Sequence, residues 1–180
     1  FSRLNTKSKK IKFSKKEINR VSTKIDKNLK RSIDTAYARI KKFHLKQKFK
    51  PFRYKDNFKN ELAYKYSPIN NVGVYVPGGT ASYPSTVLMN CIPALVAGVK
   101  NIFLTTPCLG DKVNPAIIYA AKKCGVKEIY KTGGAHSIAA LSYGTKTFKK
   151  VDKIVGPGNS YVASAKKEVF GEVGIDMVAG

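Results

Sequence analysis

Three glycine-containing turns, each following a short apolar run, carry the residues best placed to bind a ligand. Their sequences are GVYVPGG at 73–79, TGGAH at 132–136 and VGPGN at 155–159. Glycine tolerates positive φ and lets a ligand approach the backbone closely. The N–H groups that open a following helix can bind an anion such as a phosphate. If each turn follows a parallel strand, all three meet at the carboxyl edge of one sheet, where open α/β sheets bind their ligands.

Each turn also carries a side chain that can form hydrogen bonds: Tyr75, His136 and Asn159. None of the turns is the G-x-G-x-x-G dinucleotide fingerprint, and the chain has no G-x-x-x-x-G-K-[ST] loop. A single turn of this kind is explained more simply as a tight connection between a strand and a helix. Three of them together favour a crevice for a nucleotide or phosphate.

The remaining chemically reactive side chains are few. Three cysteines, Cys91, Cys108 and Cys124, form no C-x-x-C pair, which argues against a disulfide framework and a zinc knuckle. Cys91 and Cys124 are predicted to lie in helix cores, and Cys108 has no general base near it in the sequence. His44 and His136 cannot complete a zinc site by themselves, so we expect no metal ligand here and place His44 on a helix.

Strands and helices alternate from residue 71 onward. Short β-rich runs predict strands at 72–76, 101–105, 128–132, 152–155 and 175–177. Helices are predicted between them, from about Ser85 to Gly98, from Asn114 to Gly125, and over 137–143 and 160–170. This alternation predicts an α/β fold, a Rossmann-like parallel sheet with helices on both faces.

The segment before residue 71 lacks this alternation of strands and helices. Ser14 and Glu17 form a capping box, and apolar residues then recur every three or four positions, which predicts one buried helical stripe. Its members are Ile18, Val21, Ile25, Leu29, Ile33, Tyr37 and Ile40. Asp26 could cap a second helix, so one bent helix and two helices are both possible. Residues 51–71 are expected to be irregular or extended. We therefore predict a helical segment with its connector at 1–70 and a ligand-binding domain at 71–180.

The net charge of +23 is concentrated near the N-terminus. Residues 1–60 hold 21 Lys and Arg against 4 Asp and Glu, whereas residues 61–180 hold 13 against 7. Only five of the 34 basic residues are arginine, and the lysines surround the predicted helices instead of forming one stripe. A solvated basic surface is favoured over a nucleic-acid site. No apolar run approaches the ~20 residues that span a bilayer, and no secretory signal opens the chain.

The sequence from about Val72 to Gly180 resembles the histidinol dehydrogenase family. The resemblance rests on GVYVPGGTASYPSTVLMNCIPALVAGVKNI, GVKEIYKTGGAHSIAALSYGT, KVDKIVGPGNSYVASAK and IDMVAG. That family oxidises L-histidinol through an aldehyde to L-histidine, the last step of histidine synthesis. The resemblance implies two NAD⁺ per turnover, a zinc requirement, a homodimer and a fold related to the aldehyde dehydrogenases. The odd number of cysteines, with no C-x-x-C pair, favours reduced thiols in a cytosol-like compartment, so we expect a cytoplasmic location.

The resemblance also implies three NAD-binding residues. Tyr75 matches the family's tyrosine in GVYVPGG, and Asn159 matches its asparagine in GPGN. His136 stands where the family usually has glutamine, and we expect it to keep the hydrogen-bonding role. Val178 replaces the proline of the family's DMPAG.

No catalytic residue is expected within this chain. The family's substrate serine would follow Gly180, and its Glu-His base pair and zinc ligands come later still. Both ends of the chain look cut, and the 180 residues alone are expected to be inactive. Two other functions remain open: a basic nucleic-acid-binding module and an interaction scaffold without an active site.

Overall fold

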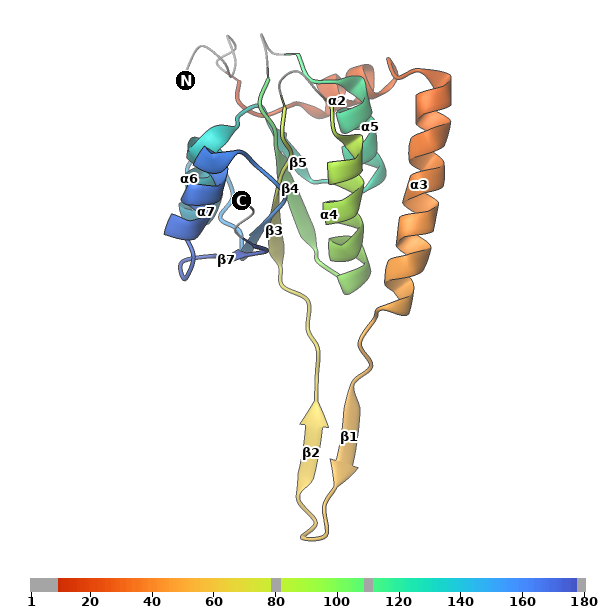
Figure 1. The fold of residues 1–180 in the computed structure, drawn as a ribbon, viewed down its shortest axis with the longest axis vertical. Helices are drawn as coiled ribbons and strands as arrows, with labels where there is room; N and C mark the ends of the chain where they lie inside the picture. Colours follow the sequence, from red (N-terminus) through yellow and green to blue (C-terminus); the bar gives the residue numbers. More distant parts are fainter. Residues whose placement is uncertain (1–9, 79–81, 109–111, 178–180) are drawn as a thin grey trace.

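A five-stranded parallel sheet forms the centre of the protein (Figure 1). The computed structural model describes residues 10–78, 82–108 and 112–177. The strands are β3 (Asn71–Tyr75), β4 (Asn101–Thr105), β5 (Glu128–Tyr130), β6 (Lys153–Val155) and β7 (Gly174–Ile175). Their order is β5-β4-β3-β6-β7. The chain therefore winds outward from β3 in both directions, and its topological switch point lies between β3 and β6.

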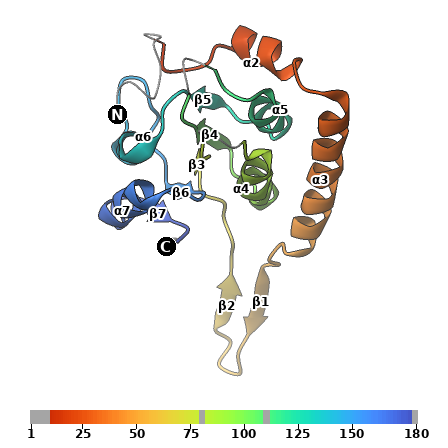
Figure 2. The same ribbon diagram turned by 45° about the horizontal axis from the view of Figure 1, so that its top comes forward.

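Helices cover both faces of this sheet (Figures 1 and 2). One face carries α4 (Pro84–Ala97) and α5 (Pro115–Lys123), and the other carries α6 (Gly134–Tyr143) and α7 (Ser160–Glu168). Neighbouring strand residues point to opposite faces, so each strand supplies both apolar layers. Val74 packs in the layer under α4 and α5, and Tyr75 packs in the layer under α6 and α7. The predicted α/β fold is confirmed.

Two helices precede the sheet, in agreement with the alternative in which Asp26 caps a second helix. Helix α2 (Lys15–Ser22) begins at the predicted capping box, in which the Ser14 N–H donates to Glu17 Oε2 at 2.8 Å. Helix α3 (Lys27–Lys46) begins at Asp26, whose carboxylate accepts from two backbone N–H groups. They pack outside α5 and α4, respectively (Figure 2). Six of the seven stripe residues pack on the core, but Leu29 is 42% exposed, so the stripe prediction is wrong there.

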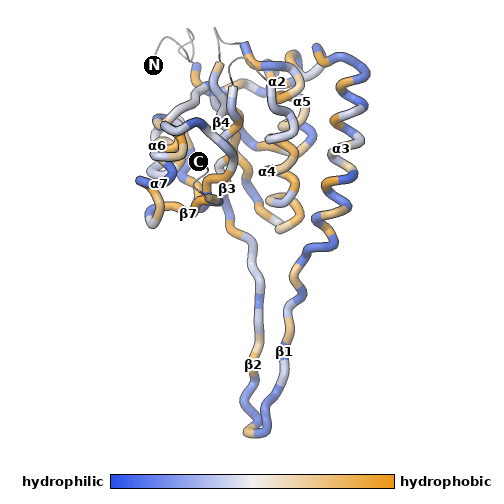
Figure 3. Tube along the Cα trace, viewed as in Figure 1, coloured by the Kyte–Doolittle hydropathy of each residue, from blue (hydrophilic) through white to orange (hydrophobic). Residues whose placement is uncertain are grey.

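Residues 51–71 contain an antiparallel hairpin that extends from the body (Figure 1). Its strands are β1 (Phe52–Lys55) and β2 (Glu61–Tyr64), and all eight strand residues are exposed. Asp56 shapes the turn by accepting from the N–H groups of Phe58 and Asn60. The expectation of extended structure is confirmed for the two strands, but their pairing into a hairpin was not predicted. Figure 3 shows hydrophobic residues gathered in β3, α4 and β7, whereas α3 is largely hydrophilic.

Most element boundaries agree with the sequence patterns to within two residues. The predicted strand over 175–177 is wrong in its bounds, because β7 is Gly174–Ile175 and ends before Asp176. The predicted strand over 101–105 is observed, as are the Asn114 cap and the left-handed Gly98 that ends α4. Strand β5 ends at Tyr130, earlier than predicted, and α6 begins at Gly134 instead of residue 137. Gly134 has φ of 68°, so the chain turns within the glycine pair and enters the helix at once. Among the described residues, no helix is long and apolar enough to cross a membrane.

Candidate functional site

The three glycine turns meet at the carboxyl edge of the sheet. Pro107, which follows β4, packs against the backbones of both Gly78 and Gly133. A Cβ at Gly78 would lie 2.8 Å from the Pro107 carbonyl oxygen, and one at Gly133 would collide with the proline ring. These two glycines therefore allow neighbouring turns to pack closely, as the simpler explanation of a tight connection requires. Gly79 lies outside the described residues.

Tyr75 joins the first turn to the second. Its ring is buried, with 4% of the residue exposed, and its hydroxyl oxygen accepts from the Gly134 N–H at 3.2 Å. Burial raises the pKa of the Tyr75 phenol, although the Gly134 hydrogen bond opposes that shift, so the hydroxyl keeps its proton at neutral pH. A protonated phenol that accepts one hydrogen bond can still donate another. Tyr75 can thus offer a donor at the N-terminus of α6.

Gly156 joins the third turn to Tyr75. It has φ of 110°, and a Cβ there would collide with the Tyr75 carbonyl oxygen. This contact lies at the topological switch point between β3 and β6, the usual place for a ligand in an open α/β sheet. Only a glycine satisfies both the backbone angle and the close approach.

Asn159 occupies the N-cap position of α7. Its Oδ1 atom accepts from the Val162 N–H at 3.1 Å, and the residue is exposed. The capping bond uses the side-chain carbonyl and leaves the amide Nδ2 with two N–H donors. The structural role of Asn159 is therefore established, and its donors remain compatible with a ligand at the same edge.

His136 is exposed in the first turn of α6. The N-cap of this helix is Gly133, which supplies no side-chain cap. The first N–H groups of a helix carry a partial positive charge, so this end of α6 suits an anionic group. Tyr75, His136 and the start of α6 thus come from neighbouring parts of one edge.

Two buried ion pairs were not found from the sequence. Lys166 pairs with Asp176 and Lys131 pairs with Glu17, and each lysine side chain is only 3% exposed. The two sequences, SAKKEVF and YKTGG, contain no pattern that separates these lysines from the many exposed ones. Their burial depends on tertiary packing, which a local pattern does not report.

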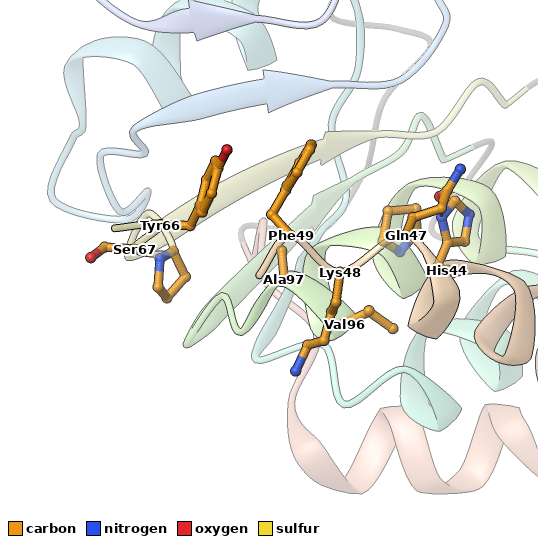
Figure 4. A pocket seen from close by; sticks show the side chains of 10 residues that line it. His44, Gln47, Lys48, Phe49, Tyr66, Ser67, Val96 and Ala97 are labelled. Atoms are coloured by element: carbon orange, nitrogen blue, oxygen red, sulfur yellow. Dashed lines mark hydrogen bonds between the residues drawn. The ribbon is translucent and has the colours of Figure 1, made fainter. Parts of the chain in front are cut away.

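His44 lies far from the three turns. It sits near the end of α3 with its Nδ1 atom 2.6 Å from Gln47 Oε1, and it lines a cavity of about 510 Å³ (Figure 4). The stacked rings of Phe49 and Tyr66, and Ala97 at the end of α4, line the same cavity. Because α4 starts beyond the carboxyl edge of the sheet and runs back, its end marks the amino edge. The cavity is therefore remote from the candidate site.

The cysteines offer no activated nucleophile. All three are buried, and a hydrogen bond with Cys124, reinforced by burial, raises the pKa of the Cys91 thiol well above its ordinary value. The predicted core positions of Cys91 and Cys124 are confirmed. Within the described ranges 10–78, 82–108 and 112–177, no three His, Cys, Asp or Glu residues lie close enough to hold a metal ion.

The fold defines the class: a doubly wound α/β protein with three glycine turns at the carboxyl edge of its sheet. Comparison with known proteins then identifies the family within this fold class. The sequence model of the family described as histidinol dehydrogenase matches residues 1–180. The chain is 61% identical over 166 residues to the histidinol dehydrogenase of Pelagibacter ubique, covering 92% of this chain and 39% of that relative. It is 51% identical over all 180 residues to the Mesorhizobium japonicum histidinol dehydrogenase, covering 42% of it.

A solved structure agrees with these relatives. The crystal structure of histidinol dehydrogenase from Elizabethkingia anophelis superimposes with a TM-score of 0.92 at 42% identity, covering 96% of this chain and 40% of that one. The chain belongs to the histidinol dehydrogenase family. It spans about 40% of the length of the relatives that it matches.

Proposed function

We propose that the complete protein carrying these residues is a cytoplasmic, homodimeric oxidoreductase that converts L-histidinol to L-histidine through the aldehyde. Membership of the histidinol dehydrogenase family over the whole chain is the observation that carries this proposal. NAD⁺ is the proposed electron acceptor and zinc the proposed metal.

Within that protein, we assign residues 71–180 to the binding of NAD⁺ and residues 1–70 to a helical segment that supports it. The convergence of the three turns at the switch point supports this assignment. Tyr75, His136 and Asn159 are the proposed contacts. The residues fit a dinucleotide, because the start of α6, whose N-cap glycine supplies no side-chain cap, suits a phosphate, while the Tyr75 hydroxyl and Asn159 amide can donate.

The proposed work of this part is to position the cofactor. Bound NAD⁺ supplies the hydride acceptor. The start of α6 would hold a phosphate, and Tyr75 and Asn159 would fix the orientation of the dinucleotide by donating hydrogen bonds. Tyr75 stays protonated in this role because burial raises its pKa. The described residues do not fit zinc, so we place its ligands elsewhere in the complete protein and assign no metal step here.

The test is NADH formation by the purified complete protein with L-histidinol, NAD⁺ and zinc. We expect NADH formation that depends on histidinol and stops when a chelator removes the metal. Residues 1–180 alone, assayed in parallel, should form no NADH, since the proposed base and metal ligands are missing. A complete protein that binds histidinol and zinc but forms no NADH would contradict the proposed function. Zinc-dependent activity of the 180 residues would contradict the division of roles.

A further inference from the structure

A buried network links the third glycine turn to the end of the sheet. The Lys166 side chain, on α7, donates from Nζ to the Gly156 carbonyl oxygen at 3.1 Å and to the Asp176 carboxylate. Asp176 follows β7, and its second carboxylate oxygen accepts from the Gly156 N–H at 2.8 Å. Both backbone polar groups of one buried glycine are therefore held by one ion pair.

Burying this ion pair costs free energy, because its charges lose contact with water. The Lys166 side chain is 3% exposed and that of Asp176 is 30% exposed, so both charges are substantially removed from water. Burial alone would raise the pKa of Asp176, but the Lys166 ammonium and the N–H groups of Gly156 and Met177 outweigh it and lower the pKa. The carboxylate is thus ionised at neutral pH. Hydrophobic residues of similar volume would fill the same space without the cost of removing charges from water.

The position of Gly156 indicates the role of the Lys166–Asp176 ion pair. Gly156 packs against the Tyr75 carbonyl on one side, and the chain reaches Asn159 three residues later. Any movement of Gly156 therefore changes the separation between the two proposed NAD contacts. The Asn159 cap ties the start of α7 to the turn, and Lys166 ties the same helix to it two turns further on. The turn is thus held from α7 and from β7 together.

We infer that Lys166 and Asp176 are positioning residues that fix the Gly156–Asn159 turn against Tyr75 and so set the affinity for NAD⁺. This inference rests on the proposed function, because it assigns the turn to the same dinucleotide site. Neither residue needs to touch the cofactor. Their effect passes through the two hydrogen bonds to the backbone of Gly156.

Asp176→Asn tests the inference in the complete enzyme. An amide has one acceptor and one donor end, so in either orientation one N–H group that now faces a carboxylate oxygen would face another donor. We expect the KM for NAD⁺ to rise about tenfold while the KM for histidinol stays within about twofold, because a displaced turn weakens the dinucleotide contacts first. The measurement is steady-state kinetics with each substrate varied, beside the melting temperature.

Glu17→Gln is the matched control. Glu17 is also 30% exposed, also pairs with a lysine that is 3% exposed, and also accepts from a backbone N–H, but its partner Lys131 holds no part of the Gly156 turn. This variant should lower the melting temperature without changing the KM for NAD⁺. If Asp176→Asn behaves in the same way, the ion pair only stabilises the fold and the inference is wrong.

A double variant covers the case in which Asp176→Asn does not fold. Lys166→Met with Asp176→Leu removes both charges and therefore the penalty for leaving one of them unpaired. The Gly156 N–H and carbonyl still lose their partners, so the KM for NAD⁺ should remain raised. A normal KM for NAD⁺ in the folded double variant would overturn the inference. The wild-type enzyme distinguishes this failure from that of the proposed function, since only the latter abolishes NADH formation in the wild type.

Discussion

Asn159 meets two demands with one amide group. Its carbonyl oxygen caps α7 through the Val162 N–H, and its amide nitrogen is the part proposed to face NAD⁺. A cap contributes to stability, whereas a ligand contact contributes to affinity. Removing the side chain should therefore affect two separate measurements.

Asn159→Ala in the complete enzyme should lower stability by about 1 kcal/mol, the usual cost of losing an N-cap. It should also raise the KM for NAD⁺ about fivefold, since a net hydrogen bond is worth about 1 kcal/mol, and leave the KM for histidinol nearly unchanged. The control is Asn114→Ala, which removes the similar cap of α5 and should lower only the melting temperature. If the Asn159 variant melts lower with an unchanged KM for NAD⁺, the residue is only a cap.

His136 poses a different question, because the sequence resemblance implies glutamine at this position. His136→Gln should leave the KM for NAD⁺ within about fivefold of the wild type, since one side chain that can form a hydrogen bond replaces another. The measurement is the KM for NAD⁺ together with kcat. Loss of activity in this variant would instead assign His136 a role of its own, such as proton transfer.

Single residues were predictable from the sequence only where a local pattern marked them. Tyr75 ends a strand, His136 and Asn159 follow strands, and each lies near glycines; the sheet brings their turns to one edge. Lys166 and Asp176 lie ten residues apart with a strand between them, and nothing in that spacing requires contact. Their pairing follows from where β7 joins the sheet, which is a tertiary fact.

At the scale of elements, the capping box at the start of α2 does more than begin a helix. Glu17 accepts from the Ser14 N–H and also pairs with the buried Lys131 beyond β5. The hydrogen bonds from the Ser14 backbone and hydroxyl, followed by the pairing with Lys131, lower the pKa of Glu17 from 4.5 to about 2 against the effect of burial. This carboxylate thus joins the helical segment to the sheet.

The lowered pKa predicts an acid dependence with a definite sign. A carboxylate whose pKa is lower in the folded state stabilises the fold fully above its unfolded pKa of 4.5, and that contribution is lost as the pH falls towards about 2. The melting temperature of the complete protein should therefore exceed that of Glu17→Gln at neutral pH, and the difference should shrink between these two pH values. A difference that stayed constant over this range would show that the carboxylate charge is not the stabilising feature.

Caps and helix-breaking glycines made most elements predictable, whereas the hairpin was predicted only as irregular or extended structure. Ser14, Asp26 and Asn114 mark helix starts, and Gly98 marks a helix end. In β1, Phe52 and Tyr54 alternate with Arg53 and Lys55, a period of two that is typical of a strand. The pairing itself could not be predicted from burial, because every residue of both strands is exposed.

At the scale of the whole molecule, the basic charge is the property that the proposed function does not use. The excess lies mainly in residues 1–60, and the described part of this range, from residue 10 on, includes α2, α3 and the first strand of the hairpin. Among the lysines described there, Lys12 pairs with Glu128, and Lys30 and Lys41 lie over the rings of Tyr119 and Tyr37. Several of these charges thus take part in packing, and hydrophilic residues predominate along α3 (Figure 3).

This distribution predicts weak DNA binding. Affinity that comes only from lysines on several surfaces depends on the release of counterions and falls steeply with salt, so binding should vanish near about 0.15 M salt. A fluorescence titration of a labelled duplex with the complete protein, repeated at increasing salt, measures this. An acidic protein of similar size, titrated in parallel, shows the background. Sub-micromolar binding that persists at that salt concentration would require a built nucleic-acid surface, because dispersed charge alone cannot hold DNA against competing ions.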